Sequence, residues 1–414
     1  MEDPCPLVID PTGRDIHGEA ARIRERGPVT LVELPDGVRA WAVSAPELLK
    51  RLLTDPRVSR DPRRHWPRWM NGEISPQWPL FTWVAVRNMF TAYGGEHRRL
   101  RDLVSKAFTA RRTAMLQPRV EEITKTLLDD VEEAGRRGRA VDLRERFCYP
   151  LPIQVISELL GLPEEQGAEL RAVVDGTFHT SASPEEVTDI YARFYAALGE
   201  LVALKRRSPG DDLTSALIAA RDDEDGTRLS EQELLDTLML IISAGHETTV
   251  NLIDNAIHLL LAHPAQLAHV RAGSASWDDV IEEALRVEAP VASLPLRYAV
   301  QDLTVSEIGG PDGVVIREGE AILAAYAAAG RHPDKYGESA AAFDVTRGDK
   351  EHLAFGYGVH FCLGAPLGRL EARIAVPALF DRFPGLRLAV TSGELEPVDS
   401  FISNGHRSLP VHLS

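Results

Sequence analysis

The amino-acid sequence predicts a mainly α protein with small β-sheets, organised around one long central helix. Most of the 414 residues follow the helical repeat of apolar positions, and only two short stretches have the composition and turn residues of β-hairpins. The clearest single element is a capped, strongly apolar helix that begins after Ser230. Because no internal repeat or low-complexity tract divides the chain, we expect one domain over residues 1–414, with a β-rich part at about 25–60 and an α-rich core at about 95–300 and 350–385.

The two predicted hairpins lie at residues 29–44 and 303–322. In the first, two runs rich in valine flank a Pro-Asp-Gly turn, and in the second a glycine cluster separates two short runs. A segment between residues 61 and 93 is rich in Trp, Pro, Phe and Met and fits neither period. We expect it to form a long apolar loop with a short helix, of the kind that walls a ligand site.

The central helix is predicted from its caps and its composition. Ser230 and Glu233 have the spacing of a capping box, and Pro264 marks the end of the helical pattern. About thirty helical residues would span roughly 45 Å. The middle of this segment is apolar nearly all round, so the helix must run through the protein interior. Further helices follow Ser276 and the cysteine loop, and Pro377 should kink the latter helix or lie near its end.

Charge and cysteine usage exclude several classes of protein. The net charge of −16 argues against a general nucleic-acid binder, because neutralising phosphates requires an excess of Lys and Arg. The opening residues lack the pattern of a signal peptide, and no run of eighteen apolar residues occurs, so we expect a cytoplasmic protein with no membrane span. Three widely spaced cysteines form neither a disulfide framework nor a CxxC metal pair. A basic stretch at residues 97–112 could steer an acidic partner or be an ordinary solvated helix face.

The sequence FGYGVHFCLG at residues 355–364 contains the most informative cysteine, Cys362. Glycines let the backbone approach a flat ligand and adopt positive φ, and the amides at the start of the following helix would favour a thiolate. Taken alone, Cys362 could equally be a small buried apolar residue in a glycine-rich turn. A dinucleotide-binding loop fits poorly, because the GxG lacks its third glycine and no strand-then-helix unit surrounds it.

This stretch resembles the haem-binding signature FGxGxHxCxG of the cytochrome P450 family. The matching residues are Phe355, Gly356, Gly358, His360, Cys362 and Gly364. The resemblance covers nearly the whole chain and looks closest to soluble actinomycete members that oxidise natural products, macrolides or steroids. It implies the cytochrome P450 fold, with the long central helix over the haem, and a haem b whose iron is bound by Cys362.

A second motif lies in the middle of the central helix, at residues 244–248. Ala244 and Gly245 share the helical face of Thr248, so small residues leave a hollow beside a hydroxyl. A mid-helix threonine could instead bond to the carbonyl four residues earlier and only bend the helix. A zinc-protease HExxH motif is excluded because residue 250 is valine. The run is similar to the family's AGxET motif, which implies that Glu247 and Thr248 are catalytic and deliver protons during oxygen activation.

A third motif pairs Glu283 with Arg286 on one helical face. Such a pair on a surface would contribute only about 0.5 kcal/mol. The resemblance, however, implies that these residues are the family's ExxR pair, which forms a buried clamp, and that Arg347 completes it.

The resemblance also assigns residues to the two propionates of the haem, whose burial requires paired donors. These residues are His97, Arg101, Arg297 and His360. The remaining basic residues of the 97–112 stretch are then expected to be free for an electron donor on the cysteine side of the haem. They are Arg98, Arg99, Lys106, Arg111 and Arg112.

The resemblance implies a substrate pocket between the central helix, the apolar segment before residue 91, a segment near residue 294 and the turn near residue 402. Each residue there could instead belong to the core. The candidate pocket residues are Trp83, Met89, Phe90, Leu240, Val291, Leu294 and Ile402.

The implied activity is a haem-thiolate monooxygenase that inserts one oxygen atom from O2 into a C–H bond of a hydrophobic small molecule. No flavin or iron–sulfur domain is fused to the chain, so we expect electrons from a ferredoxin and a ferredoxin reductase, and we expect a monomer. Two alternatives are a specialised reaction on the same scaffold, such as oxidative coupling, dehydration or a peroxide-driven reaction, and a non-catalytic haem sensor or electron carrier. The presence of Glu247 and Thr248 disfavours a sensor and a peroxide-specialised site.

Overall fold

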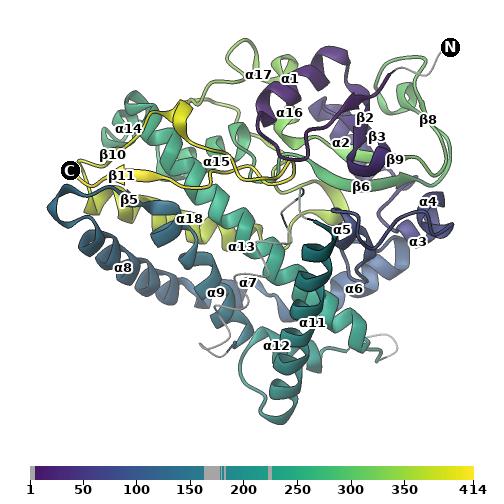
Figure 1. Ribbon diagram of the computed structural model, residues 1–414, viewed down its shortest axis with the longest axis horizontal. Helices are drawn as coiled ribbons and strands as arrows, with labels where there is room; N and C mark the ends of the chain where they lie inside the picture. The colour runs from purple at the N-terminus through teal and green to yellow at the C-terminus, as the bar shows by residue number, and fades with distance from the viewer. Residues whose placement is uncertain (1–4, 163–177, 179, 181–182, 222–225) are drawn as a thin grey trace.

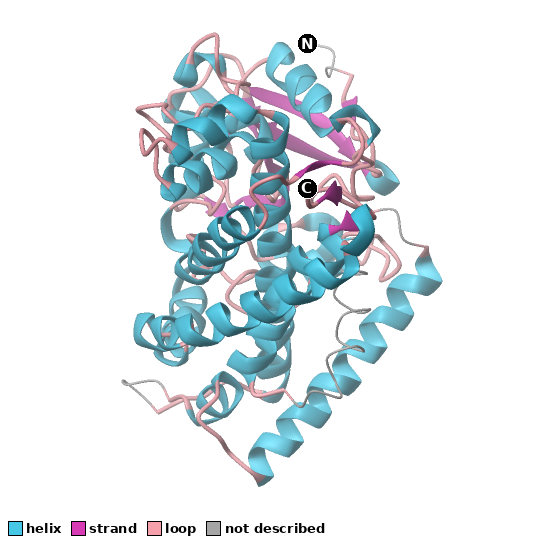
Figure 2. Cartoon of the chain, turned by 90° about the vertical axis from the view of Figure 1, so that its left-hand side faces the viewer, coloured by secondary structure: helices cyan, strands magenta, loops and turns pink. Residues whose placement is uncertain are grey.

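The structure, a computed structural model, describes residues 5–162, 178, 180, 183–221 and 226–414. It is mainly α with small sheets, as the sequence predicts (Figure 1). In Figure 2 the larger sheet lies in the upper part of the molecule, and most of the long helices lie below it. The helices are α1 Ile16–Arg26, α2 Pro46–Thr54, α3 Pro62–His65, α4 Pro67–Met70, α5 Phe81–Ala85, α6 Gly94–Ala107, α7 Ala110–Met115, α8 Gln117–Ala134, α9 Pro150–Leu160, α11 Pro184–Arg207, α12 Leu213–Ala219, α13 Glu231–Ala262, α14 Pro264–Arg271, α15 Trp277–Val287, α16 Tyr326–Gly330, α17 Pro333–Tyr336 and α18 Ala365–Arg382.

The larger sheet has six strands in the order β1-β2-β3-β9-β6-β4. Its strands are β1 Leu7–Val8, β2 Val29–Leu34, β3 Val38–Val43, β4 Val58–Ser59, β6 Leu294–Ala299 and β9 Ala321–Ala324. The predicted first hairpin is confirmed, because β2 pairs antiparallel with β3 around a turn in which Asp36 has a φ of 59°. Asp tolerates this left-handed conformation better than most side chains. Since β3 also pairs in parallel with β9, the sheet joins the N-terminal strands to residues 321–324.

Two smaller sheets complete the β structure. Their strands are β5 Val141–Asp142, β7 Leu303–Thr304, β8 Val315–Ile316, β10 Arg387–Leu388 and β11 Pro410–His412. The second predicted hairpin is right only in part. β7 pairs with β8 as expected, but residues 321–324 belong to the larger sheet, where their apolar side chains are buried.

The central helix of the prediction is α13, which runs for 32 residues from Glu231 to Ala262. Ser230 caps it, and both hydrogen bonds of the predicted capping box with Glu233 are present. The helix packs against α9, α11, α15 and α18, and most of its side chains are buried (Figure 1). An apolar surface on every side of this helix is therefore covered by neighbouring helices, which confirms that it passes through the interior.

The aromatic segment at residues 61–93 contains three short helices, α3, α4 and α5, where one was expected. Each of the first two starts at a proline, which is well suited to the first helical turn. The segment is fixed to the larger sheet by its aromatic side chains: the Trp66 ring stacks on Tyr298 with centroids 5.2 Å apart, and Trp78 Nε1 donates to the Pro35 carbonyl at 3.0 Å. This wall is therefore ordered by side-chain contacts with the sheet.

The helices predicted after Ser276 and after the cysteine loop are α15 and α18. Ser276 caps α15 in a second capping box. The α18 helix begins at Ala365 and continues past Pro377 to Arg382, so the proline lies inside the helix near its end. The missing amide of a proline removes one bond of the helical ladder, and packing against α8, α13 and α15 holds the helix together there.

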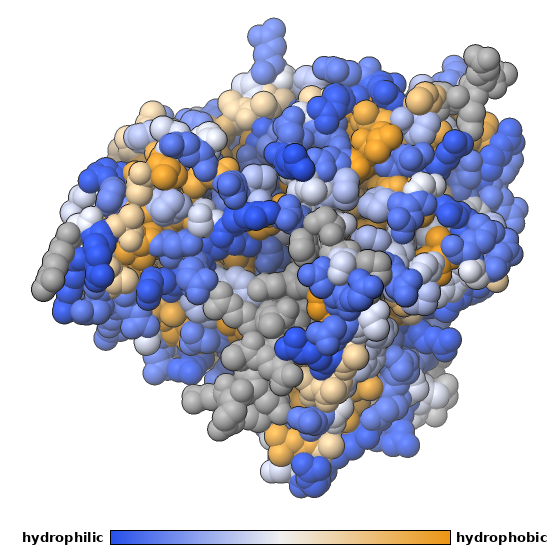
Figure 3. All heavy atoms as spheres, viewed as in Figure 1, coloured by the Kyte–Doolittle hydropathy of each residue, from blue (hydrophilic) through white to orange (hydrophobic). Residues whose placement is uncertain are grey.

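The molecular surface is mostly hydrophilic on the face drawn in Figure 3, where hydrophobic residues form small separate groups. Within the ranges that the structure describes, none of the helices combines the length and apolar character needed to cross a lipid bilayer.

A buried ion pair holds the C-terminal turn against α13. Asp254 is fully buried, and its carboxylate accepts hydrogen bonds from His406 Nδ1 at 2.7 Å and from the His406 backbone amide at 3.1 Å. Burial alone would lower the pKa of His406, but the Asp254 carboxylate raises it above its usual value. The protonated form of His406 is therefore the one that this contact stabilises.

We predict that His406→Gln reduces stability more at about pH 6 than at about pH 8.5, by roughly 1 kcal/mol, because the charged donor is lost and a neutral one replaces it. The sign follows from the raised pKa. The stabilisation is fully present below the unfolded pKa of about 6.5 and is lost as the pH rises through the folded value. The melting temperatures of the two proteins at both pH values give the measurement, and a pH-independent difference would contradict the charged pairing.

Candidate functional site

The cysteine loop is shaped by glycines and by the start of α18. Cys362 donates its backbone N–H to the Phe355 carbonyl at 2.9 Å, which closes the loop. Gly356 and Gly358 have φ of +73° and +72°, a conformation that L side chains rarely adopt. A Cβ on Gly358 would also lie 2.8 Å from the Thr54 side chain, so the loop can pack on α2 only with glycine at this position.

The Cys362 thiol lies at the N-terminus of α18. Burial raises the pKa of this thiol, and hydrogen bonds from the backbone amides of Gly364 and Ala365 act in the opposite direction, as does the nearby Arg101 guanidinium. These donors would stabilise a thiolate that had a cation to bind. A Cβ on Gly364 would lie 3.9 Å from the Cys362 sulfur, so this side of the sulfur is closely covered by backbone.

An apolar cavity joins the cysteine loop to α13. Cys362, Gly364, Phe355 and Gly356 line it from the loop, and Ala244, Gly245 and Thr248 line it from α13. Six of the seven predicted pocket residues also line it: Trp83, Met89, Phe90, Leu240, Val291 and Leu294. Most of the residues that the sequence placed in one site therefore surround a single cavity.

Ile402 is the predicted pocket residue that does not line this cavity. Its side chain is fully buried in the cluster beside the larger sheet, and its carbonyl accepts a hydrogen bond from the Ala292 amide at 2.7 Å. The C-terminal turn therefore supports the segment near residue 291 from behind, and this prediction is corrected.

The sequence left two roles open for Thr248, a place beside the ligand site and a hydrogen bond within its own helix, and the structure shows both. The Thr248 hydroxyl lines the cavity and also donates a hydrogen bond to the Ala244 carbonyl at 2.5 Å. Gly245 faces α9, because a Cβ there would lie 3.0 Å from the Ile156 side chain. The glycine therefore allows α9 and α13 to approach each other closely, in addition to lining the cavity.

Glu247 is not among the residues that line the cavity. Its Oε1 accepts hydrogen bonds from Arg144 Nη2 at 3.1 Å, Asn251 Nδ2 at 3.2 Å and Ser403 Oγ at 3.0 Å, and the group is buried. Arg144 was not predicted because it lies 103 residues away along the chain, and no local spacing relates it to Glu247. The carboxylate of Glu247, next to Thr248 in the sequence, is therefore held in place by three hydrogen bonds.

A cluster of basic residues lies in the cavity wall beside the cysteine loop, where Arg101 donates to the Phe361 carbonyl at 2.8 Å. Arg101, Arg297 and His360 line the cavity, and the His97 ring lies 4.1 Å from the His360 ring. The Arg297 Nη1 and the His97 Nε2 are buried without a hydrogen-bond partner among the described residues. The cluster also includes Arg60, which the sequence analysis missed because it lies just after β4 in a stretch without a recognisable motif.

Mutual repulsion and burial lower the basicity of this cluster. Burial lowers the pKa of His97 to about 4, and the Arg101 and Arg60 guanidiniums act in the same direction. Burial also lowers the pKa of Arg101 below its usual value. Such a concentration of donors is stabilised when acidic groups bind to it. Glu371, which lines the cavity from α18, has no polar partner among the described residues, and burial raises its pKa well above the usual value, which favours the neutral carboxyl group.

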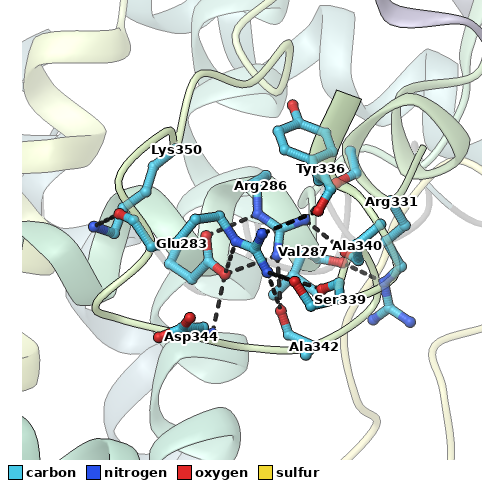
Figure 4. Close-up of polar contacts among 12 residues, drawn as sticks. Glu283, Arg286, Val287, Arg331, Tyr336, Ser339, Ala340, Ala342, Asp344 and Lys350 are labelled. Atoms are coloured by element: carbon cyan, nitrogen blue, oxygen red, sulfur yellow. Dashed lines mark hydrogen bonds and ion pairs between the residues drawn. The ribbon is translucent and has the colours of Figure 1, made fainter. Parts of the chain in front are cut away.

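Glu283, Arg286 and Arg347 meet in one buried ion-pair cluster (Figure 4). Glu283 and Arg286 are fully buried and are joined by two hydrogen bonds of 2.7 Å, and Arg347 Nε lies 3.1 Å from Glu283 Oε1. Arg286 also donates to three backbone carbonyls, those of Gly330, Ala340 and Ala342. The cluster therefore ties α15 to the chain that leads into the cysteine loop.

Three of the five basic residues expected to be free for an electron donor already have partners on the protein. They are Arg99 (with Glu96 and Glu233), Lys106 (with the Arg221 carbonyl) and Arg112 (with Asp211). Arg98 and Arg111 are exposed. The expectation of five available cations is therefore corrected, because several of them hold α6 and α7 to their neighbours.

Comparison with known proteins agrees with this geometry. The family model described as Cytochrome P450 matches residues 200–274 and 277–392. The chain is 46% identical to the 2-hydroxy-5-methyl-1-naphthoate 7-hydroxylase of Streptomyces carzinostaticus, over 99% of this chain and 98% of that protein. It is 39% identical to the 6-deoxyerythronolide B hydroxylase of Saccharopolyspora erythraea, over 95% of both. The solved structure of CYP154A1 from Streptomyces coelicolor A3(2) covers 99% of this chain and 100% of its own, with a TM-score of 0.92 and 55% identity.

The chain belongs to the cytochrome P450 family and is a P450 monooxygenase. Members of this family carry a haem whose iron is bound by a cysteine thiolate. The residues present fit such a group. Cys362 lies among amide donors at the cavity wall, and the cavity is bordered by buried Arg297 and His97 atoms that need acceptors, as the carboxylates of a haem would supply.

We predict that Glu283→Gln lowers the free energy of unfolding by about 3–5 kcal/mol, because Arg286 would keep its buried charge without a counter-charge. Asp278→Asn is the matched control on the same helix, since Asp278 pairs with Arg373 at the surface and should cost less than about 1 kcal/mol. Urea denaturation of both variants gives the measurement. Similar losses for the two would contradict a special role for the buried cluster.

Proposed function

We propose that this enzyme inserts one oxygen atom from O2 into a C–H bond of a hydrophobic small molecule, using a haem b bound through Cys362. The observation that carries the proposal is one apolar cavity lined by the Cys362 thiol and by Thr248 of α13. When bound, the haem would supply the redox-active iron at which oxygen is activated, and its thiolate ligand would favour O–O cleavage. The protein residues supply binding, orientation and protons.

The proposed haem-binding residues act from two directions. Cys362 would bind the iron, with its charge stabilised by the amides of Gly364 and Ala365. The two propionate carboxylates of the haem would bind Arg101, Arg297, His97 and His360, which lie close together in the cavity wall. Phe355, Gly356, Ala244 and Gly245 would border the flat group.

Thr248 and Glu247 are the proposed proton-delivery residues. Thr248 lines the cavity from the middle turn of α13, as do Ser243 and Thr249, and the hydrogen bond from its hydroxyl to the Ala244 carbonyl sets its orientation. Glu247 is held by Arg144, Asn251 and Ser403, so it would act on Thr248 through the arrangement of this polar cluster or after its side chain rotates. Both residues hold or move a proton, and neither contributes a metal ligand.

Electrons would come from a separate ferredoxin and its reductase. The surface of the cysteine loop supports this docking site, because Tyr357, Val359 and Phe361 are exposed there. Arg98 and Arg111 are exposed on the neighbouring helices α6 and α7 and carry the positive charge that attracts an acidic partner. Apolar contact with a basic surround is typical of a transient protein interface.

The substrate would be a natural product of macrolide, steroid-like or polycyclic type. Two relatives are named as hydroxylases of 2-hydroxy-5-methyl-1-naphthoate and of 6-deoxyerythronolide B, which are bulky hydrophobic molecules. The cavity walls support such a ligand, because Trp83, Phe90, Met89, Leu240 and Leu294 line them.

The proposal is tested by the absorption spectrum of the dithionite-reduced, CO-treated protein. We expect a Soret band at about 450 nm, which reports thiolate opposite CO. Cys362→His should move the band to about 420 nm, whereas Cys5→Ser, which changes an exposed cysteine, should leave it unchanged. A protein without haem, or a band that Cys362→His does not move, would overturn the assignment.

A second prediction concerns Thr248. Thr248→Ala should retain haem and ligand binding but divert reducing equivalents to hydrogen peroxide, with product per NADPH falling by about 10-fold or more, because proton transfer by a positioned group contributes that much or more. Thr248→Ser keeps a hydroxyl at the same position and should restore most of the coupling. The ratio of product and peroxide to NADPH consumed is measured with ferredoxin and reductase. Unchanged coupling in Thr248→Ala would show that the hydroxyl only bends the helix.

A further inference from the structure

Asp236 is a buried acidic residue near the start of α13, outside the motif at residues 244–248. It is only 1% exposed. Its Oδ1 accepts hydrogen bonds from the Tyr195 hydroxyl and from Gln232 Nε2, the latter at 2.8 Å. Its Oδ2 accepts a hydrogen bond from the Arg87 backbone amide at 2.5 Å. A polar group that is removed from water needs such partners, and these neutral donors supply them.

The donors come from three separate parts of the chain. Gln232 lies one turn earlier on α13 itself, whereas Tyr195 lies on α11 and Arg87 lies in the loop between α5 and α6. The backbone carbonyl of Asp236 accepts a further hydrogen bond from Asn88 Nδ2 at 2.8 Å. Asp236 therefore joins both α11 and the loop after α5 to the central helix.

The loop that Asp236 holds forms part of the cavity wall. Asn88, Met89 and Phe90 line the cavity, and Asp236 is not among the residues that line it. The Asn88 side chain connects the two: its Nδ2 donates to the Asp236 carbonyl, and its Oδ1 accepts a hydrogen bond from the Phe90 amide at 2.9 Å. Asp236 can therefore act on a ligand through the wall residues that it holds in place.

The order of this wall affects the affinity for a ligand that contacts it. Loss of conformational freedom on binding lowers affinity, so a wall that is already ordered binds a bulky ligand more tightly than a mobile wall does. Without the Asp236 acceptors, residues 87–90 would gain freedom in the ligand-free protein. A ligand too small to reach this part of the cavity would not be affected.

We propose that Asp236 is a positioning residue for the substrate: its contacts fix the cavity wall at residues 88–90, and the affinity for bulky ligands depends on them. This inference deepens the function proposed above and rests on it for the assignment of the cavity as the substrate site. The hydrogen bond from Tyr195 extends the same junction to α11, so the position of that helix and the shape of the wall are linked.

Hydrogen–deuterium exchange measures the junction itself, with no ligand present. The Arg87 amide should exchange about 10-fold faster in Asp236→Ala than in the wild-type protein, because its acceptor is lost. Asp236→Asn has nearly the same shape and keeps an oxygen that can accept from Arg87, so it should retain most of the protection. An exchange rate that is unchanged in Asp236→Ala would overturn the proposal.

Ligand binding is measured on the haem-loaded protein with imidazole and with clotrimazole. Both contain the ring that binds iron, and clotrimazole adds a bulky triaryl group that reaches the cavity walls. The dissociation constant of clotrimazole should rise about 10-fold in Asp236→Ala and about 5-fold in Tyr195→Phe, and that of imidazole should stay within about twofold. Asp236→Asn should restore most of the clotrimazole affinity.

Tyr191→Phe is the matched control for Tyr195→Phe. Tyr191 lies one turn away on the same helix, and its hydroxyl contacts that of Tyr195 at 3.0 Å. Because the bond between Tyr195 and Asp236 remains in this variant, both azole affinities should stay within about twofold of the wild-type values. An effect on clotrimazole as large as that of Tyr195→Phe would overturn the proposal.

Two further results would also overturn it. Equal weakening of imidazole and clotrimazole at full haem content would show that Asp236 only supports the fold. Clotrimazole affinity that is unchanged in Tyr195→Phe would separate α11 from the wall, and this variant decides the question where Asp236→Ala does not fold. A wild-type protein without haem would instead contradict the function proposed above, and the exchange measurement distinguishes the two cases because it needs neither haem nor ligand.

Discussion

The buried ion-pair cluster of Glu283, Arg286 and Arg347 is the constraint on which the functional site depends. The Arg286 guanidinium donates hydrogen bonds to Glu283 and to the carbonyls of residues 330, 340 and 342. These bonds fix the segment of residues 330–342 to α15. That segment leads directly into the cysteine loop. Because α15 also packs on α13 and α18, the cluster fixes the loop relative to both helices that wall the cavity. The ion-pair cluster therefore contributes to the site by fixing the position of the backbone, in addition to its contribution to the free energy of folding.

The central helix combines two functions that make opposite demands on its side chains. As the interior helix of the domain, α13 must be apolar on nearly every side, yet its middle turn contains Glu247, Thr248 and Asn251. The structure meets this by giving each polar group a partner: Thr248 bonds to its own helix, and Arg144 and Ser403 reach Glu247 from distant parts of the chain. A buried polar network of this kind is tolerated only when it is satisfied.

The sequence was sufficient for features set by local spacing. The capped α13 and α15 helices, the first hairpin and the grouping of Cys362 with Thr248 around one cavity follow from caps, turn residues and motif resemblance. It was insufficient where the partner lies far away in the chain. Arg144 beside Glu247, the placement of residues 321–324 in the larger sheet and the burial of Ile402 behind the pocket all depend on tertiary contacts that no local pattern encodes.

The charged side chains in the cavity wall suit a bound group that carries carboxylates. Burial without a partner raises the pKa of Glu371 and so favours its neutral form, whereas a guanidinium is far harder to deprotonate, even though burial lowers the pKa of Arg60. Among the described residues that line the cavity, positive charge is therefore in excess. The basic groups beside the cysteine loop, Arg60 among them, suit a bound dianion, and the Arg60 guanidinium also stacks on the Phe90 ring.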